Sequence, residues 1–259
     1  MKILFIGDIV GKSGRSVLSR QLGRILQDLN IELCIANCEN AAGGFGLTAE
    51  VGQEILASGV DVMTSGNHIW DKREVFDYIR DEPRLLRPAN YVNDLPGRGT
   101  MTVTLPSGVD VTIANISGRA FLDCIDCPFQ AMDRIIGSLR RQPQICLVDF
   151  HAEATAEKLA MGWYVDGRIS ALVGTHTHVQ TADERVLPQG TAYITDVGMT
   201  GAFDGVIGFR PEDSIYRFKT GISRPLQVAK ENKGINAVVI SIDEKTGKAI
   251  SIERLSTLK

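Results

Sequence analysis

The polar residues that directly follow apolar runs in this chain are of types that bind metal ions. Five such runs are followed by Asp8, Glu39, Asn40, Asn67, His68, His151, His176 and His178. These eight residues include all four histidines of the chain. Imidazole, carboxylate and amide groups together suit iron, manganese or zinc, and the absence of cysteine from the set argues against a structural cysteine-rich zinc site.

The segment "GTHTHV" (174–179) places two imidazoles two residues apart. Alternate residues of an extended segment face the same side, so His176 and His178 are expected to project together. Taken alone, each candidate has an ordinary structural role: Asp8 as a turn former or helix cap, and His151 as a hydrogen-bonded core histidine. The metal-site hypothesis therefore depends on all of them occurring together. One ion does not need so many ligands, and Glu39 could bridge two ions about 3.5–4 Å apart, as in phosphate-ester cleavage.

The apolar runs and amphipathic stretches predict the elements that position these residues. Strands are expected over 2–7, 32–37, 60–66, 145–151, 169–176 and 191–198, and helices over 16–29, 48–59, 71–79 and 129–141. Two antiparallel hairpins are expected over 99–116 and 236–255. Early βαβ units and later hairpins indicate a mixed α/β protein with two sheets. No composition shift or linker divides the sequence, so we expect a single domain over 1–259.

Several segments resemble the motif blocks of calcineurin-like metallophosphoesterases, which read roughly GDxH, GDxxD, GNHD/E, H and GHxH. The corresponding segments here are, in order, "GDIVG", "NCEN", "SGNH", "DFHAE" and "GTHTH". Two departures are informative: Val10 replaces the histidine of the first block, and Glu39 followed by Asn40 replaces the usual aspartate. These departures resemble the YmdB-like branch, with its "GDIVGxxGR", "NxEN", "SGNHxWD" and "DGRxSAxxGTHTHVxTAD" segments. The resemblance covers nearly the whole chain.

The resemblance implies a four-layer αββα sandwich of two mixed β-sheets flanked by helices, with a dinuclear metal centre. It implies that the first ion is held by Asp8, Glu39, Asn40 and His178, and the second by Glu39, Asn67, His151 and His176. In this scheme Asn40 substitutes for the missing histidine and Glu39 bridges. His68 would bind no metal and would protonate the leaving oxygen. The implied activity is hydrolysis of phosphodiesters, including 2′,3′-cyclic or 3′,5′-cyclic nucleotides, by a hydroxide that two iron or manganese ions, or zinc, activate.

Two other functions fit parts of the sequence. The segment "GDIVGKS" (7–13) looks like a phosphate-binding Walker A loop, but three residues instead of four separate Gly7 from Gly11. A non-enzymatic, metal-stabilised sensor or scaffold that binds cyclic nucleotides is the second alternative, and His68, which no ligand shell needs, argues against it. The "CIDC" segment, with Cys124 and Cys127, has no second CxxC and is expected to be a loop before a helix that starts near Pro128.

Composition and charge limit the classes of binding partner that we expect. The net charge is −3 and no run of Lys or Arg occurs, so neither duplex nucleic acid nor an anionic membrane surface is an expected partner. No run of about 20 apolar residues and no secretion signal is present, and five cysteines are an odd number, so we expect a cytoplasmic protein. The exposed faces of the hairpins could support a homo-oligomer, although nothing in the sequence specifies one.

Overall fold

The structure is a computed structural model that describes residues 1–92, 94–123, 125–139 and 145–258. The helices in these ranges are α1 (Gly11–Leu29), α2 (Ala49–Ala57), α3 (Val75–Asp81), α4 (Pro128–Ser138), α5 (Thr155–Val165) and α6 (Pro211–Thr220), with a 3₁₀ turn η1 (Ile69–Asp71). The first sheet contains β1 (Lys2–Ile6), β2 (Asp8–Ile9), β3 (Leu33–Asn37), β4 (Val62–Thr64), β11 (Met199–Ala202), β12 (Lys233–Ile242) and β13 (Ala249–Ser256). The second sheet contains β5 (Thr100–Thr104), β6 (Asp110–Ser117), β7 (Ile145–His151), β8 (Ala171–Thr175), β9 (Arg185–Val186) and β10 (Ala192–Ile194).

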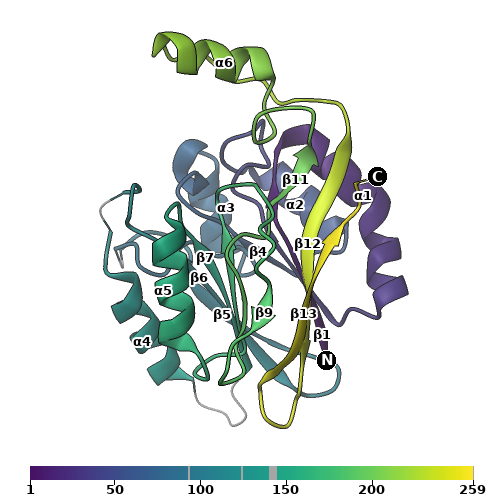
Figure 1. The fold of residues 1–259 in the computed structure, drawn as a ribbon, viewed down its shortest axis with the longest axis vertical. Coiled ribbons are helices and arrows are strands. Elements are labelled where there is room, and N and C mark those ends of the chain that lie inside the picture. The colour runs from purple at the N-terminus through teal and green to yellow at the C-terminus, as the bar shows by residue number, and fades with distance from the viewer. Residues whose placement is uncertain (93, 124, 140–144, 259) are drawn as a thin grey trace.

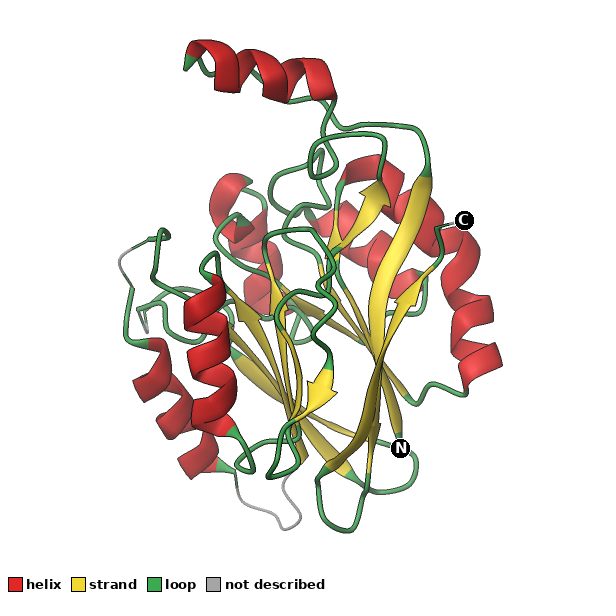
Figure 2. Ribbon diagram, in the orientation of Figure 1, coloured by secondary structure: helices red, strands yellow, loops and turns green. Residues whose placement is uncertain are grey.

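The two sheets pack face to face, and helices cover their outer faces (Figures 1 and 2). Alternation along β1 shows how the sequence builds these layers, because Ile3 and Phe5 face the second sheet while Leu4 and Ile6 face the helices. The outer cluster on the first sheet includes side chains of α1, α2 and α3. The corresponding cluster on the second sheet includes side chains of α4 and α5. The predicted four-layer αββα sandwich is confirmed.

Both sheets are mixed, as expected. The first has the order β2-β11-β12-β1-β3-β4, with β13 paired to β12. Within it, β1 is parallel to β3 and antiparallel to β12. The second sheet has the order β5-β6-β7-β8-β10-β9, and its central strands β6, β7, β8 and β10 run parallel. The carboxyl ends of parallel strands therefore meet at one end of the sandwich.

Both predicted hairpins form, as β5–β6 and β12–β13. Thr48 caps α2 as expected, because its side chain accepts a hydrogen bond from the N–H of Val51 at 3.3 Å. The helix expected over 16–29 begins earlier, at Gly11. Glycines 11 and 14 favour a turn by propensity, but a Cβ at Gly14 would overlap the carbonyl oxygen of Thr200. Close packing of α1 on β11 therefore outweighs the local preference.

Three other segments differ from the predictions. The helix expected over 71–79 is split into η1 and α3, because Lys72 between them is extended. The strand expected over 191–198 ends at Ile194, and after Gly198 the chain enters β11 in the other sheet. Helix α6 is not among the predicted elements, and it projects from one end of the sandwich (Figure 1). None of the helices in the described ranges is long and apolar enough to cross a membrane.

Candidate metal centre

All eight candidate residues lie at the end of the sandwich where the strands of both sheets finish. The first sheet contributes Asp8 in β2, Glu39 and Asn40 after β3, and Asn67 and His68 after β4. The second sheet contributes His151 at the end of β7, and His176 and His178 after β8. The backbone N–H of His176 donates to Asp8 Oδ2 at 3.3 Å, which joins the two groups across the sheets. Segments from opposite parts of the sequence thus form one site, in keeping with ligand sites beyond strand carboxyl ends.

Glu39, Asn67 and His176 each contact His151 directly, and we call these four residues the closed half. His151 Nε2 lies 3.0 Å from Glu39 Oε1, 3.0 Å from Asn67 Oδ1 and 3.0 Å from His176 Nδ1. Ligand atoms of Glu39, His151 and His176 all lie within 4.8 Å of one another. The Glu39 and His151 side chains are almost completely buried. Such a group can hold a metal ion, and without one the three facing atoms share the single hydrogen on His151 Nε2.

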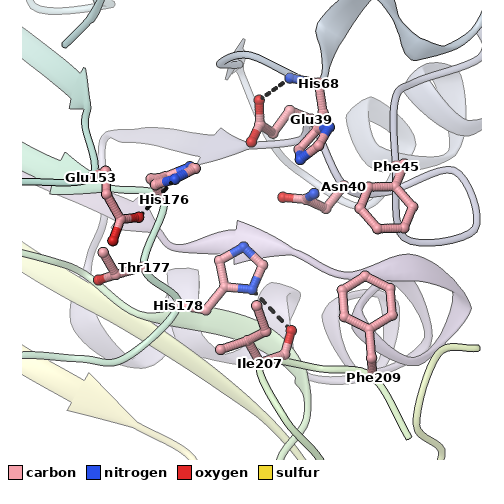
Figure 3. Close-up of a pocket in the computed structure, with 10 residues that line it drawn as sticks. All are labelled: Glu39, Asn40, Phe45, His68, Glu153, His176, Thr177, His178, Ile207 and Phe209. Carbon is pink, nitrogen blue, oxygen red and sulfur yellow. Dashed lines mark hydrogen bonds and ion pairs between the residues drawn. The ribbon is translucent and has the colours of Figure 1, made fainter. Parts of the chain in front are cut away.

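Three further residues, Asp8, Asn40 and His178, form what we call the open half. Asp8 Oδ1 and Asn40 Oδ1 are buried and have no hydrogen-bond partner among the described residues. His178 Nε2 lies 3.8 Å from Asp8 Oδ1, too far for a hydrogen bond. His178 Nδ1 donates to the carbonyl oxygen of Ile207 at 3.0 Å (Figure 3), and Nε2 is the ring nitrogen that faces Asp8. Buried oxygens without a partner are costly, so this half fits a missing cation.

Burial and charge shift the pKa values of these groups strongly. Burial raises the pKa of the Asp8 carboxyl. Burial alone would also raise the pKa of Glu39, but the facing His151 lowers it to about 2. Burial would lower the pKa of His151, but Glu39 raises it to about 9. Burial and the charge of His151 lower the pKa of His176 to about 3. Without metal, the closed half therefore contains one ion pair, between Glu39 and His151, beside a neutral His176.

A buried network behind the closed half fixes the orientation of the His151 ring. His151 Nδ1 lies 2.9 Å from Thr175 Oγ1, which in turn donates to Asp149 Oδ1 at 2.7 Å. Since the Thr175 hydroxyl gives its hydrogen to Asp149, it accepts from His151, and Nε2 is left for the closed half. Asp149 Oδ2 also accepts from Thr64 Oγ1 at 2.5 Å and Asn37 Nδ2 at 3.0 Å, both from the first sheet. Partners of this kind set the tautomer and orientation of metal-binding histidines.

The loop that carries the two histidines is not extended, contrary to the reasoning from "GTHTHV". Both residues have left-handed backbone, with φ of 101° at His176 and 66° at His178. Both side chains nevertheless line the same cavity. Asp196 Oδ2 stabilises the turn by accepting from the N–H of Thr177 at 3.0 Å and from its hydroxyl at 2.7 Å. The buried Lys158 ammonium donates to the same oxygen at 2.8 Å.

His68 occupies a different environment. Its Nδ1 lies 2.8 Å from Asp71 Oδ2, and its backbone N–H donates to Glu39 Oε2 at 2.9 Å. Its side chain is 30% exposed, and the ring lies edge-on to Phe45 with centroids 5.0 Å apart. Because Asp71 occupies Nδ1, Nε2 is the ring nitrogen available toward the cavity (Figure 3).

The site opens into a cavity of about 270 Å³. Its lining also includes residues outside the candidate set: Phe45, Glu153, Thr177, Ile207 and Phe209. The Phe45 and Phe209 rings stack with centroids 5.0 Å apart. Glu153 Oε2 lies 3.0 Å from His176 Nε2 and so orients that ring from the side away from His151. Its position two residues after His151 was a usable signal, whereas nothing local marked the two phenylalanines.

Of the two cysteines in "CIDC", Cys127 directly precedes α4, which begins at Pro128 as expected. Cys124 lies outside the described residues.

Buried carboxylate and imidazole groups at the strand ends of an αββα sandwich define a hydrolase of the phosphoesterase type. A model of the YmdB-like protein family matches residues 4–255, and the chain belongs to that family. The chain is 49% identical over 255 residues to the 2′,3′-cyclic-nucleotide 2′-phosphodiesterase of Bacillus subtilis (strain 168), covering 98% of this chain and 96% of that protein. These findings confirm the resemblance seen in the sequence.

Two solved structures share the fold closely. A crystal structure of a hypothetical protein from Thermus thermophilus superposes with a TM-score of 0.94 at 37% identity, over all of both chains. A crystal structure of a novel phosphatase from Mycoplasma pneumoniae superposes with a TM-score of 0.94 at 33% identity, over all of this chain and 93% of that one. The chain is accordingly an enzyme of the phosphodiesterase and phosphatase class.

Proposed function

We propose that the protein is a metal-dependent phosphodiesterase that hydrolyses small cyclic nucleotides, with 2′,3′-cyclic nucleotides as its main substrates. One observation carries this proposal: two unpartnered buried oxygens, Asp8 Oδ1 and Asn40 Oδ1, lie beside an imidazole–carboxylate cluster at the bottom of a small cavity. The name of the Bacillus subtilis relative supports the substrate class. The 3′,5′-cyclic nucleotides are secondary candidates.

The donor set fits two transition-metal ions. We assign Asp8, Asn40 and His178 to one ion and Asn67, His151 and His176 to the other, with Glu39 shared between them. Oxygen and imidazole donors without thiolate suit iron or manganese, and zinc is acceptable to the same set. The chemistry that such a pair supplies is activation of a water molecule and neutralisation of charge on the phosphoryl oxygens.

Protonation of the leaving oxygen requires a side chain of the protein itself. We assign His68 as the general acid, because its Nε2 faces the cavity while Asp71 holds Nδ1 at 2.8 Å. A proton delivered from Nε2 to the departing ribose oxygen would prevent a free alkoxide from forming, an effect worth about 10²–10⁴-fold in rate. The carboxylate of Asp71, 2.8 Å from Nδ1, fixes the ring in place.

The cavity limits the size of the substrate. A volume of about 270 Å³ is close to the lower end of small-molecule sites. The polar floor of histidines and carboxylates would take the phosphate, and the apolar wall of Phe45, Ile207 and Phe209 would contact the nucleoside. An apolar wall beside a cavity of this size suits a mononucleotide better than a long polynucleotide.

The test is hydrolysis of 2′,3′-cyclic AMP by the purified protein, before chelation, after chelation, and after Mn²⁺ or Fe²⁺ is restored. We expect activity to vanish and return, with 3′-AMP as the product if the 2′ bond is cleaved. Bis-p-nitrophenyl phosphate serves as the control substrate, since it needs no nucleoside contacts. Tight binding of intact cyclic nucleotide without turnover, with both ions present, would instead identify a sensor.

A further inference from the structure

The cavity over the candidate metal centre contains a carboxylate that neither ion uses in our assignment. Glu153 follows His151 by two residues and lines the cavity, and its side chain is 47% exposed. Figure 3 shows it beside His176, on the side of the cavity opposite Phe45 and Phe209. A carboxylate in this position faces any ligand that enters the cavity.

One oxygen of this carboxylate is held by His176. Glu153 Oε2 lies 3.0 Å from His176 Nε2, while His176 Nδ1 faces His151 Nε2 at 3.0 Å. A histidine that binds metal through one ring nitrogen carries its hydrogen on the other, so Nε2 is the donor and the ring is neutral. The contact therefore fixes the position of the carboxylate without neutralising its charge. Among the described residues, Glu153 Oε1 has no hydrogen-bond partner.

No cationic side chain in the cavity offsets this charge. None of the described residues that line the cavity is a lysine or an arginine. The Lys158 ammonium is 1% exposed and pairs with Asp196 Oδ2 at 2.8 Å, so its charge is already matched outside the cavity. Arginine and lysine are the side chains with which proteins commonly bind a doubly charged phosphate. The protein thus presents a carboxylate where a phosphomonoester site would present cations.

The small size of the cavity makes the charge effective. A volume of about 270 Å³ corresponds to a sphere about 8 Å across, so any phosphate inside lies within about one Debye length of Glu153. With the nucleoside against the apolar wall, the unesterified phosphate oxygens point toward His176 and Glu153. A phosphodiester carries one negative charge, whereas a phosphomonoester carries nearly two at neutral pH because its second pKa is about 6. Glu153 therefore repels a monoester about twice as strongly as a diester.

We propose that Glu153 makes the site select singly charged phosphodiesters and reject doubly charged phosphomonoesters, including the nucleotide that the reaction produces. This inference rests on the proposed function, because it concerns the ligand of the same cavity. At a separation of about 8 Å and an effective dielectric constant of about 20 to 40, one extra charge on the ligand changes its affinity by about 5- to 30-fold. Repulsion of that size limits monoester hydrolysis and speeds release of the product.

The first experiment measures binding of 3′-AMP to the metal-loaded protein by calorimetry at about pH 8. Glu153→Gln keeps an oxygen that can accept from His176 Nε2 but removes the charge, so the metal content should stay that of the wild type and 3′-AMP should bind at least about tenfold more tightly. Glu50→Gln is the matched control, because Glu50 is exposed on α2 and does not line the cavity. It should bind 3′-AMP as the wild type does. A Glu153→Gln variant that binds 3′-AMP no more tightly than the wild type would overturn the proposal, whether or not the protein hydrolyses diesters.

The second experiment compares kcat/KM for p-nitrophenyl phosphate and bis-p-nitrophenyl phosphate. The wild type should prefer the diester, and Glu153→Gln should raise the ratio of monoester to diester hydrolysis by about 5- to 30-fold. Glu153→Ala also loses the contact with His176, so it should lower both rates while shifting the ratio in the same direction. If Glu153 only orients His176, both substrates should be affected equally, and an unchanged ratio in the two variants would refute the selectivity role. Failure of the metal-loaded wild type to hydrolyse the diester would contradict the proposed function, and the 3′-AMP comparison would still decide the role of Glu153.

Discussion

The two halves of the candidate metal centre differ in whether their polar atoms have partners within the protein. In the closed half, His151 Nε2 lies 3.0 Å from each of Glu39, Asn67 and His176, so these groups share its one hydrogen, and Glu39 forms an ion pair with the ring. In the open half, Asp8 Oδ1 and Asn40 Oδ1 have no partner in the described part of the chain. An ion entering the closed half must displace a proton and an ion pair, whereas an ion entering the open half relieves unsatisfied oxygens.

This difference predicts unequal affinities of the two halves for metal. The open half gains partners for its buried oxygens when it binds a cation, so we expect it to fill first. The closed half should fill second, and its affinity should depend on the protonation of His151. The variants and conditions below test this contrast, beginning with the largest expected effect.

The largest effect should come from Glu39, which we assign to both halves. Glu39→Gln keeps the shape of the side chain but removes the charge that a cation and His151 require. We expect turnover to fall by at least about 10³-fold, because several kcal/mol of charge stabilisation are lost. Metal analysis should show fewer than two ions per chain. A variant that keeps both ions and full activity would show that the halves do not share this residue.

Loss of the His68 side chain should lower turnover and leave metal binding in both halves unchanged. His68→Ala is expected to lower kcat by about 10²–10⁴-fold while the metal content stays that of the wild type. Asp71→Asn should lower it less, because the ring remains and only its carboxylate partner is lost. Loss of metal from His68→Ala would place this histidine among the ligands and remove its role as the acid.

The Thr175 hydroxyl allows the closed half to be weakened alone. Thr175→Val removes the acceptor of His151 Nδ1 and one donor to Asp149, so metal affinity should fall by about 10–100-fold. Thr175→Ser, which keeps the hydroxyl, should retain the wild-type affinity. Competition with a coloured chelator would measure both. Equal affinities for the Val and Ser variants would mean that the network does not orient the ring.

The last test is the pH dependence of metal affinity in the closed half. Burial lowers the pKa of His151, but Glu39 outweighs burial and raises it to about 9, so below that pH the ring must release a proton before it can bind. Affinity should therefore rise with pH, by about tenfold per unit, and level off near pH 9. The same chelator competition, repeated from neutral pH upward, would show this slope. An affinity independent of pH over that range would contradict it.

The positions of the ligand candidates were predictable because apolar runs reveal where strands end, and parallel strand ends meet at one edge. The mixed α/β class could be predicted from the same pattern, whereas the four-layer sandwich was expected only from the family motifs. The buried hydrogen-bond network around Asp149, behind the closed half, could not be predicted. Asp149 lies inside the run "CLVDFH" and appears in the sequence as an interruption of a buried strand, although it joins the two sheets through Thr64 and Asn37.

The loop conformation and α6 were missed for other physical reasons. Left-handed backbone at His176 depends on Asp196 and Lys158, which are remote in sequence. Helix α6 carries usable local signals, with Pro211 at its start and Gly221 at its end. Its apolar side chains Ile215 and Phe218 are exposed, however, so the segment has no core-facing stripe on which a helix prediction could rest.

The position of β12 has a consequence for how the protein is made. This strand lies between β1 and β11, so the residues next to Asp8 are held by a strand that is synthesised after every other strand of the first sheet except β13. Until then β1 has an unpaired apolar edge, a state that favours aggregation. The nascent chain should accordingly expose this edge until β12 has been made, and the half of the site built around Asp8 should be the last to form.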